Sequence, residues 1–203
     1  MFFGADVSHD SSDKVSTAAI VGSLDPKFIH YGVKLSEQRH EIQSRKSKEI
    51  INDLLDMVFQ LIQSFKKRNR ILPDILIFYR DGVDEGQFEI VNNKEISEIK
   101  KACKRIDEDY EPKITFIIVQ KRHHVRFFPT ETGETVENKA IMNIGPGRVI
   151  DTTVTTKNHK NFFLCSHVAL KVNSKHTFYF QKKYIYFLIF PGHCTANSLL
   201  GHL

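Results

Sequence analysis

The 203-residue chain is long enough for one sizeable domain, and its 41% hydrophobic and 26% charged residues are ordinary for a globular protein. A net charge of +5 permits a polyanionic partner without identifying one. Cys103, Cys165 and Cys194 are too few and too scattered for a disulfide framework or a zinc site, which favours a reducing, intracellular setting. The opening MFFGADVSHD lacks the basic residues of a secretory signal, and the apolar run 184–190 is too short to span a bilayer, so no membrane partner is expected.

Three apolar segments open the chain, at 2–7, 16–25 and 28–36, and their composition is typical of β-strands. The connections between them are short, which predicts an antiparallel meander. Because the chain opens inside the first of these strands, it is interpreted as a fragment or as a domain cut from a longer protein.

A long amphipathic helix is predicted over residues 47–68, because apolar side chains recur there at intervals of three and four. These side chains are Ile50, Ile51, Leu54, Leu55, Val58, Leu61, Ile62 and Phe65. A buried strand follows at 74–80, then a second amphipathic helix at 87–107 and another buried strand at 113–121.

Beyond these elements come a loop rich in Gly and Thr, PTETGETVENK, and two strand-like segments at 149–156 and 162–170. The order of three strands, helix, strand, helix and strand predicts an α/β domain. Its mixed sheet would have three antiparallel strands, then parallel ones joined by helical crossovers, with helices on both faces. This order is that of the RNase H-like fold.

Two acidic residues lie where such a sheet would bring them together. Asp6 is in the middle of the first strand, where a buried carboxylate is costly unless it is paired or binds a metal. Asp81 ends the fourth strand in LIFYRDGVDEGQF, where the alternative is that Asp81-Gly82 forms only a turn. If the two strands are neighbours, the two carboxylates suit Mg²⁺, and a third acid would complete a two-metal site for attack on a phosphodiester.

Seven segments, in family order, resemble the Piwi domain of Argonaute proteins. They are GADVSH (4–9), AAIVGSLD (18–25), EIINDLLDMV (49–58), IFYRDGVDEGQF (77–88), ITFIIVQKRHHVRFF (114–128), GRVIDTTVT (147–155) and FFLCSHVAL (162–170). The resemblance implies an RNase H-like Piwi domain over 1–175, incomplete at its C-terminal end, and a divergent tail over 176–203. The PAZ and MID modules of a full Argonaute are not recognised in the chain.

The resemblance also implies a site. The family cuts RNA paired to a bound guide strand, using two aspartates, a glutamate and a fourth His or Asp. Asp6 and Asp81 match the aspartates and would bind Mg²⁺ or Mn²⁺. Glu49 matches the catalytic glutamate, with Glu41 as the alternative; a structural alternative for Glu49 is an acid favoured by a helix N-terminus.

No residue matches the fourth catalytic position. His176, His193 and His202 are available in the tail, but none has the surroundings that the family has. The tail is interpreted as a truncation, an alternative exon or a translated intron.

A basic cluster, QKRHHVR, follows the strand at 113–121, and such clusters suit phosphate oxygens or form a solvated loop. The resemblance assigns guide-backbone contacts to four residues, which are Lys121, Arg126, His167 and Lys175. KKRNR at 66–70 has no such support and is interpreted as a solvated helix end.

The function implied by the resemblance is small-RNA-guided gene silencing in the cytoplasm, with the nucleus as the alternative location. The partners would be a guide small RNA and a target RNA, with silencing proteins as further candidates. The leading hypothesis is an Mg²⁺-dependent RNA endonuclease whose activity is impaired in this chain. The alternatives are a catalytically inactive module that binds nucleic acid and recruits partners, and a product that folds poorly.

Overall fold

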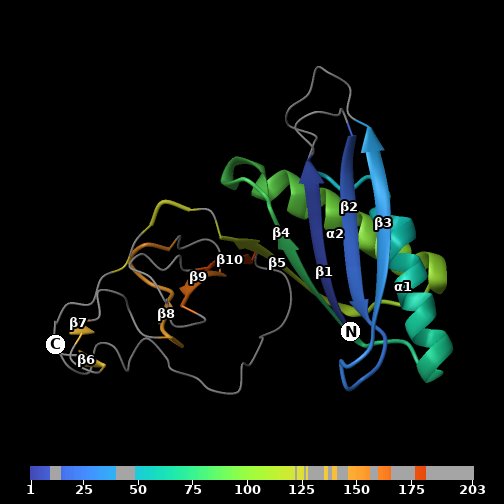
Figure 1. Ribbon diagram of the computed structural model, residues 1–203. Coiled ribbons are helices and arrows are strands. Elements are labelled where there is room, and N and C mark those ends of the chain that lie inside the picture. The colour runs from blue at the N-terminus through green and yellow to red at the C-terminus, as the bar shows by residue number, and fades with distance from the viewer. Residues whose placement is uncertain are drawn as a thin grey trace. The chain divides into compact units, whose positions relative to one another are not determined.

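The computed structural model describes residues 1–9, 15–39, 49–121, 123–125, 127, 135–136, 139–140, 146–155, 160–165 and 177–181 (Figure 1). The described residues divide into two compact units, of which the first extends to Ile118 and the second begins at Val119. No helix within these ranges is long and apolar enough to cross a membrane.

The first unit is built on a mixed sheet with the strand order β3-β2-β1-β4-β5. Its strands are β1 Phe2–His9, β2 Val15–Ser23, β3 Tyr31–Arg39, β4 Ile75–Asp81 and β5 Lys113–Gln120. The pairs β1–β2 and β2–β3 are antiparallel, and β1 runs parallel to β4. The predicted α/β class, the antiparallel meander and the mixed sheet are therefore confirmed.

Two helices of this unit, α1 Leu54–Asn69 and α2 Phe88–Ile106, lie behind the sheet in Figure 1. A short 3₁₀ helix, Glu85–Gln87, precedes α2. Strand side chains alternate between the two faces, and the ones that share the core with the helices include Phe3, Ala5, Val7, Ala18, Ile20, Leu76 and Phe78.

The described helices α1 and α2 lie on one face of the sheet, which differs from the predicted helices on both faces. The opposite face is exposed on β3. This strand is at the edge of the sheet, and Tyr31, Val33 and Leu35 are 52%, 57% and 69% exposed. The three side chains are two residues apart, so they line one face as an apolar row.

The predicted helix 47–68 is wrong at its start, because α1 begins several residues later. The backbone before it bonds to side chains of other elements. The amide of Ile51 donates to Glu95 Oε1 over 3.3 Å, and the amide of Asn52 donates to Gln38 Oε1 over 2.7 Å. These acceptors from α2 and β3 replace the helical partners that the apolar periodicity led us to expect.

The predicted strand 28–36 is also displaced, because β3 starts three residues later. The carboxylate of Asp25 accepts hydrogen bonds from the amides of Lys27 and His30, over 2.9 and 2.7 Å, and Phe28 has a φ of 57°. These bonds, that from His30 above all, hold the pKa of Asp25 below its usual value. A side-chain-capped turn therefore takes the place of the first strand residues.

The second unit contains short strands. β8 Val149–Ile150, β9 Lys160–Leu164 and β10 Thr177–Gln181 pair antiparallel in the order β10-β9-β8, and β6 Thr135–Val136 pairs with β7 Lys139–Ala140.

The strand predicted at 149–156 ends early, because β8 stops at Ile150 and Thr153 has a φ of 68°, which an extended strand does not allow. The strand predicted at 162–170 begins earlier, at Lys160, and β9 ends at Leu164. Residues 166–170 lie outside the described part of the chain.

Candidate functional site

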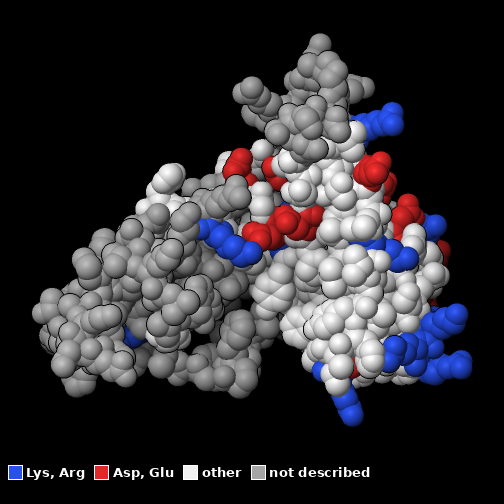
Figure 2. Space-filling view, in the orientation of Figure 1, with Lys and Arg blue, Asp and Glu red and all other residues white. Residues whose placement is uncertain are grey.

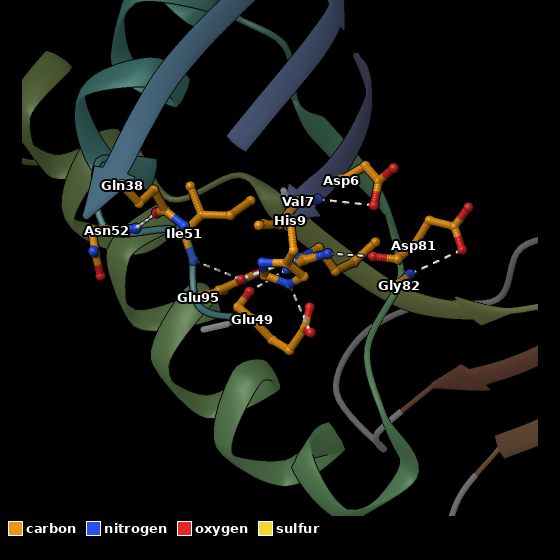
Figure 3. Close-up of polar contacts among 11 residues, drawn as sticks. Asp6, Val7, His9, Gln38, Glu49, Ile51, Asn52, Asp81, Gly82 and Glu95 are labelled. Atoms are coloured by element: carbon orange, nitrogen blue, oxygen red, sulfur yellow. Dashed lines mark hydrogen bonds and ion pairs between the residues drawn. The ribbon is translucent and has the colours of Figure 1, made fainter. Parts of the chain in front are cut away.

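Asp6 and Asp81 lie side by side on neighbouring parallel strands (Figure 3). The register of β1 and β4 pairs Ala5 with Arg80, so the next step brings Asp6 beside Asp81. The prediction that the two strands are neighbours is confirmed, and the sheet backbone itself fixes the separation of the two residues.

The expectation that Asp6 is buried is wrong. β1 alternates, with Phe3, Ala5 and Val7 buried toward the helices and Asp6 exposed on the other face, while Asp81 is half-buried. The cost of burying a charge is therefore no reason to infer a metal ion at Asp6. What supports a cation is the pairing of two carboxylates, since like charges placed together repel unless a positive charge compensates them.

Gly82 makes room for this pair. Its φ of +84° lies in the region that favours glycine, and a Cβ at this position would lie 3.0 Å from Asp6 Oδ1. Its amide donates to Asp81 Oδ1 over 2.9 Å. Asp81 is the last residue of β4 and the chain bends at Gly82, so the alternative of a turn alone does not describe the pair. The bend brings the Gly82 backbone close to both carboxylates.

Glu49 lies in the segment before α1, and its carboxylate contacts His9. His9 Nε2 is 3.0 Å from Glu49 Oε1, and His9 Nδ1 is 2.6 Å from Ser16 Oγ. The second oxygen of Glu49 is buried and has no hydrogen-bond partner among the described residues. Because Glu49 precedes the first turn of α1, the helix dipole does not explain its position.

His9 was missed in the sequence, although a signal for it exists. It is the last residue of β1 and continues the alternation of Phe3, Ala5 and Val7, so its side chain belongs to the helix-covered face. A polar residue at the end of such a series is placed to contact groups at the edge of the core, as His9 does with Glu49.

Arg80 connects the backbone at Asp81 with the backbone at Glu49. Its guanidinium is fully buried and pairs with Glu95, Nε to Oε1, over 3.3 Å. Its other two nitrogens donate to the backbone oxygens of Asp81 and Glu49. Burial raises the pKa of the Glu95 carboxyl, and the charge of Arg80 opposes this shift.

Asp6 and Asp81 supply hard oxygen donors at one place, which fits a divalent cation. Glu49 does not join them as a third ligand, because no three His, Cys, Asp or Glu side chains within the described ranges are close enough to hold a metal ion. The predicted three-carboxylate arrangement is therefore represented here by the aspartate pair, with Glu49 held separately by His9.

Figure 2 shows acidic side chains gathered in the middle of the first unit and basic ones toward the end of α1. The basic residues of the KKRNR segment are exposed, as expected of a solvated helix end; they are Lys66, Lys67, Arg68 and Arg70. A phosphate that approached the aspartate pair would meet negative charge, so it would need a bridging cation.

The predicted nucleic-acid contacts fall in the second unit or outside the described residues. Lys121 is exposed just after β5. His123, in the same basic cluster, packs edge-on against Phe163, with ring centroids 5.2 Å apart. The other predicted residues lie outside the described part of the chain; they are Arg126, His167 and Lys175, together with Glu41 and the tail histidines His176, His193 and His202.

Comparison with protein families gives a match to the profile described as the Piwi domain, over residues 1–180. Protein argonaute 2 of Oryza sativa subsp. japonica is 40% identical over 184 residues, which are 89% of this chain and 17% of that protein. The chain therefore spans less than a fifth of the length of this relative.

Two solved Argonaute structures are similar to this chain in fold. The Argonaute of Kluyveromyces polysporus with a guide RNA has a TM-score of 0.78 and 28% identity, over 98% of this chain and 22% of that one. The C-terminal lobe of a budding yeast Argonaute has a TM-score of 0.75 and 29% identity, over 91% of this chain and 37% of that one.

Replacing Gly82 with Ala should lower the free energy of unfolding by at least about 1 kcal/mol, because the left-handed backbone and the nearby Asp6 Oδ1 both oppose a Cβ. Gly86→Ala is the matched control, since a Cβ at Gly86 would have no atom within 4 Å and the φ of this residue is not positive. Urea unfolding followed by circular dichroism measures both. Equal stability of the two variants would contradict the tight approach at Gly82.

Proposed function

Because the chain belongs to the Argonaute family, of which it carries part of the Piwi domain, we propose that it takes part in small-RNA-guided silencing by binding guide and target RNA. The single observation that carries the proposal is the Asp6–Asp81 pair on the adjacent parallel strands β1 and β4 of an RNase H-like sheet. The chain matches only 17% of the rice protein, so we propose this activity for the longer protein in which such a domain works. The guide RNA in the similar Kluyveromyces polysporus structure supports RNA as the partner.

The proposed reaction is hydrolysis of a phosphodiester in the target RNA. Water attacks phosphorus, the bond to the 3′ oxygen breaks, and the products are a 5′-phosphate and a 3′-hydroxyl that receives the proton. Asp6 and Asp81 would hold Mg²⁺ or Mn²⁺, which supplies a Lewis acid for the phosphate oxygens.

The other residues of the site orient these groups. Gly82 holds the Asp81 carboxylate through its amide, and His9 holds one oxygen of Glu49. The free oxygen of Glu49 is the group we propose to complete the site in the cleaving protein. Arg80 keeps the backbones of Glu49 and Asp81 at a fixed separation.

A non-cutting module that binds RNA and recruits partners is the second candidate. One observation favours it, since Asp6 and Asp81 converge without a third acidic or histidine ligand among the described residues. The sequence also offers no match to the fourth catalytic position. Both candidates share RNA binding, so the metal and cleavage experiments distinguish them. We propose the cytoplasm as the site of action for either.

The 203-residue chain should bind Mn²⁺ weakly, as one ion, and Asp81→Asn should lower the affinity by about tenfold or more, because one of two anionic ligands is lost. Asp84→Asn is the matched control, since Asp84 is an exposed acid in the same loop. Isothermal calorimetry measures both. The shared site is excluded if Asp81→Asn and the control bind the ion equally well.

Replacing Lys121 and Arg126 together with Ala should weaken RNA binding for every sequence tested, because interactions with phosphate carry no sequence information. The log–log salt dependence should flatten by about one unit for each phosphate interaction that the substitutions remove. Lys66→Ala/Lys67→Ala removes the same charge from the exposed end of α1 and serves as the control. A fluorescence titration over a salt series measures the slopes. An unchanged slope in the first variant would identify the cluster as a solvated loop.

The isolated chain should not cleave RNA efficiently, because nothing in it matches the fourth catalytic residue and two-metal hydrolysis needs ligands for both ions. Residues 1–175 placed in a guided, cleaving Argonaute, with the MID domain and C-terminal segment of the host, should cut a matched target. Asp81→Asn should abolish this cutting, and Asp84→Asn should preserve it.

The assay uses a labelled target, a matched guide and Mg²⁺. Robust cutting at one position by the unmodified 203-residue chain would show that the fourth ligand is dispensable or comes from the tail. Guide binding without cutting by the chimeric protein would favour the second candidate.

A further inference from the structure

Glu95 is an acid on the buried side of α2, and it is only 1% exposed. Its neighbours on that side of the helix are Phe88, Val91, Asn92, Ile99, Ala102 and Cys103. Burying a carboxylate lowers the stability of the fold unless the carboxylate is hydrogen-bonded. The partners of Glu95 therefore indicate which parts of the chain it fixes.

One oxygen of Glu95 joins two parts of the chain. Oε1 accepts from Nε of Arg80 in β4 and from the amide of Ile51, each over 3.3 Å. Arg80 in turn donates to the backbone oxygens of Glu49 and Asp81. Hydrogen bonds therefore lead from Glu95 to the backbones of both site acids, and Figure 3 shows these groups together.

The segment that carries Glu49 depends on such contacts. Residues 49–53 belong to no helix or strand, so no regular backbone ladder fixes them. Their backbone groups bond to the side chains of Glu95, Arg80 and Gln38. The Glu49 carboxylate contacts His9, and the Asp53 carboxylate accepts from the Ser36 hydroxyl. Burial raises the pKa of the Glu95 carboxyl, and the charge of Arg80 opposes this shift.

We propose that Glu95 is a positioning residue, which fixes the segment that carries Glu49 by binding Arg80 and the Ile51 amide. The proposal rests on the proposed cleavage function. An ion pair with a merely structural role would stabilise the whole unit, whereas a positioning residue acts first on residues 49–52 and on the chemical step.

Two substitutions separate these roles. Glu95→Gln keeps the shape and one acceptor oxygen, and Glu95→Met removes both acceptors at similar length. Glu98→Gln, on the same helix, is the matched control, because Glu98 is part of a surface pair with Lys101.

The first readout is amide hydrogen exchange in the 203-residue chain. Relative to the core amides of β1, exchange at Ile51 should accelerate about tenfold in Glu95→Met, because a hydrogen bond to a charged acceptor is lost. The exchange rate at Ile51 should stay within about twofold of that in the unmodified chain in Glu95→Gln and Glu98→Gln. Equal acceleration at Ile51 and at the β1 core in Glu95→Met would overturn the positioning role.

The second readout is guided cleavage by the chimeric protein described above. Glu95→Met should lower kcat about tenfold or more and leave KM for the target within about twofold, because the contacts to RNA are unchanged while a catalytic group is misplaced. Glu95→Gln should retain most of kcat. A loss confined to KM, or equal losses of kcat in both variants, would contradict the proposal.

The two measurements distinguish failure of the proposed function from failure of the positioning role. If the unmodified chimeric protein does not cleave, the function is overturned, and the exchange readout still decides whether Glu95 fixes the segment that carries Glu49. If Glu95→Met does not fold, Arg80→Met/Glu95→Met removes both buried charges together, which proteins tolerate far better than losing one partner. The double variant should fold and show the same fast exchange at Ile51; slow exchange there would overturn the proposal.

Discussion

The ion pair between Arg80 and Glu95 is the interaction on which the arrangement of the site depends. Both side chains are withdrawn from water, and the desolvation of two charges offsets most of their attraction, so stability alone does not account for the pair. What the pair does is geometric. A planar guanidinium has donors in fixed directions, and here they reach the backbones of Glu49 and Asp81 while the carboxylate reaches Ile51.

The site is thereby held together in two different ways. Asp6 and Asp81 are fixed by the sheet, because their separation follows from the parallel register of β1 and β4. Among the described residues, Glu49 is held by hydrogen bonds to side chains, those of His9 and Arg80. We therefore expect a change in the core near α2 to act more on Glu49 than on the aspartate pair, which the strand register also holds.

The sequence predicted the features that depend on apolar periodicity and on chain order. The strands, both helices and the neighbouring positions of Asp6 and Asp81 follow from these, and the resemblance to the Piwi domain is confirmed by the comparisons. Two features depend on individual side chains and escaped prediction. Apolar neighbours on both sides suggested that Asp6 is buried, although strand alternation exposes it. Ile51 continues the apolar repeat of α1, yet its amide bonds to Glu95 outside the helix.

The apolar row on β3 has a consequence for handling the protein in solution. Among the described residues, β3 pairs only with β2, so one edge of the sheet presents free amides and carbonyls beside exposed Tyr31, Val33 and Leu35. An edge of this kind is a template for another extended chain. Self-association of the purified chain should therefore increase with its concentration, and a charged residue in place of Val33 should oppose strand addition without touching the site.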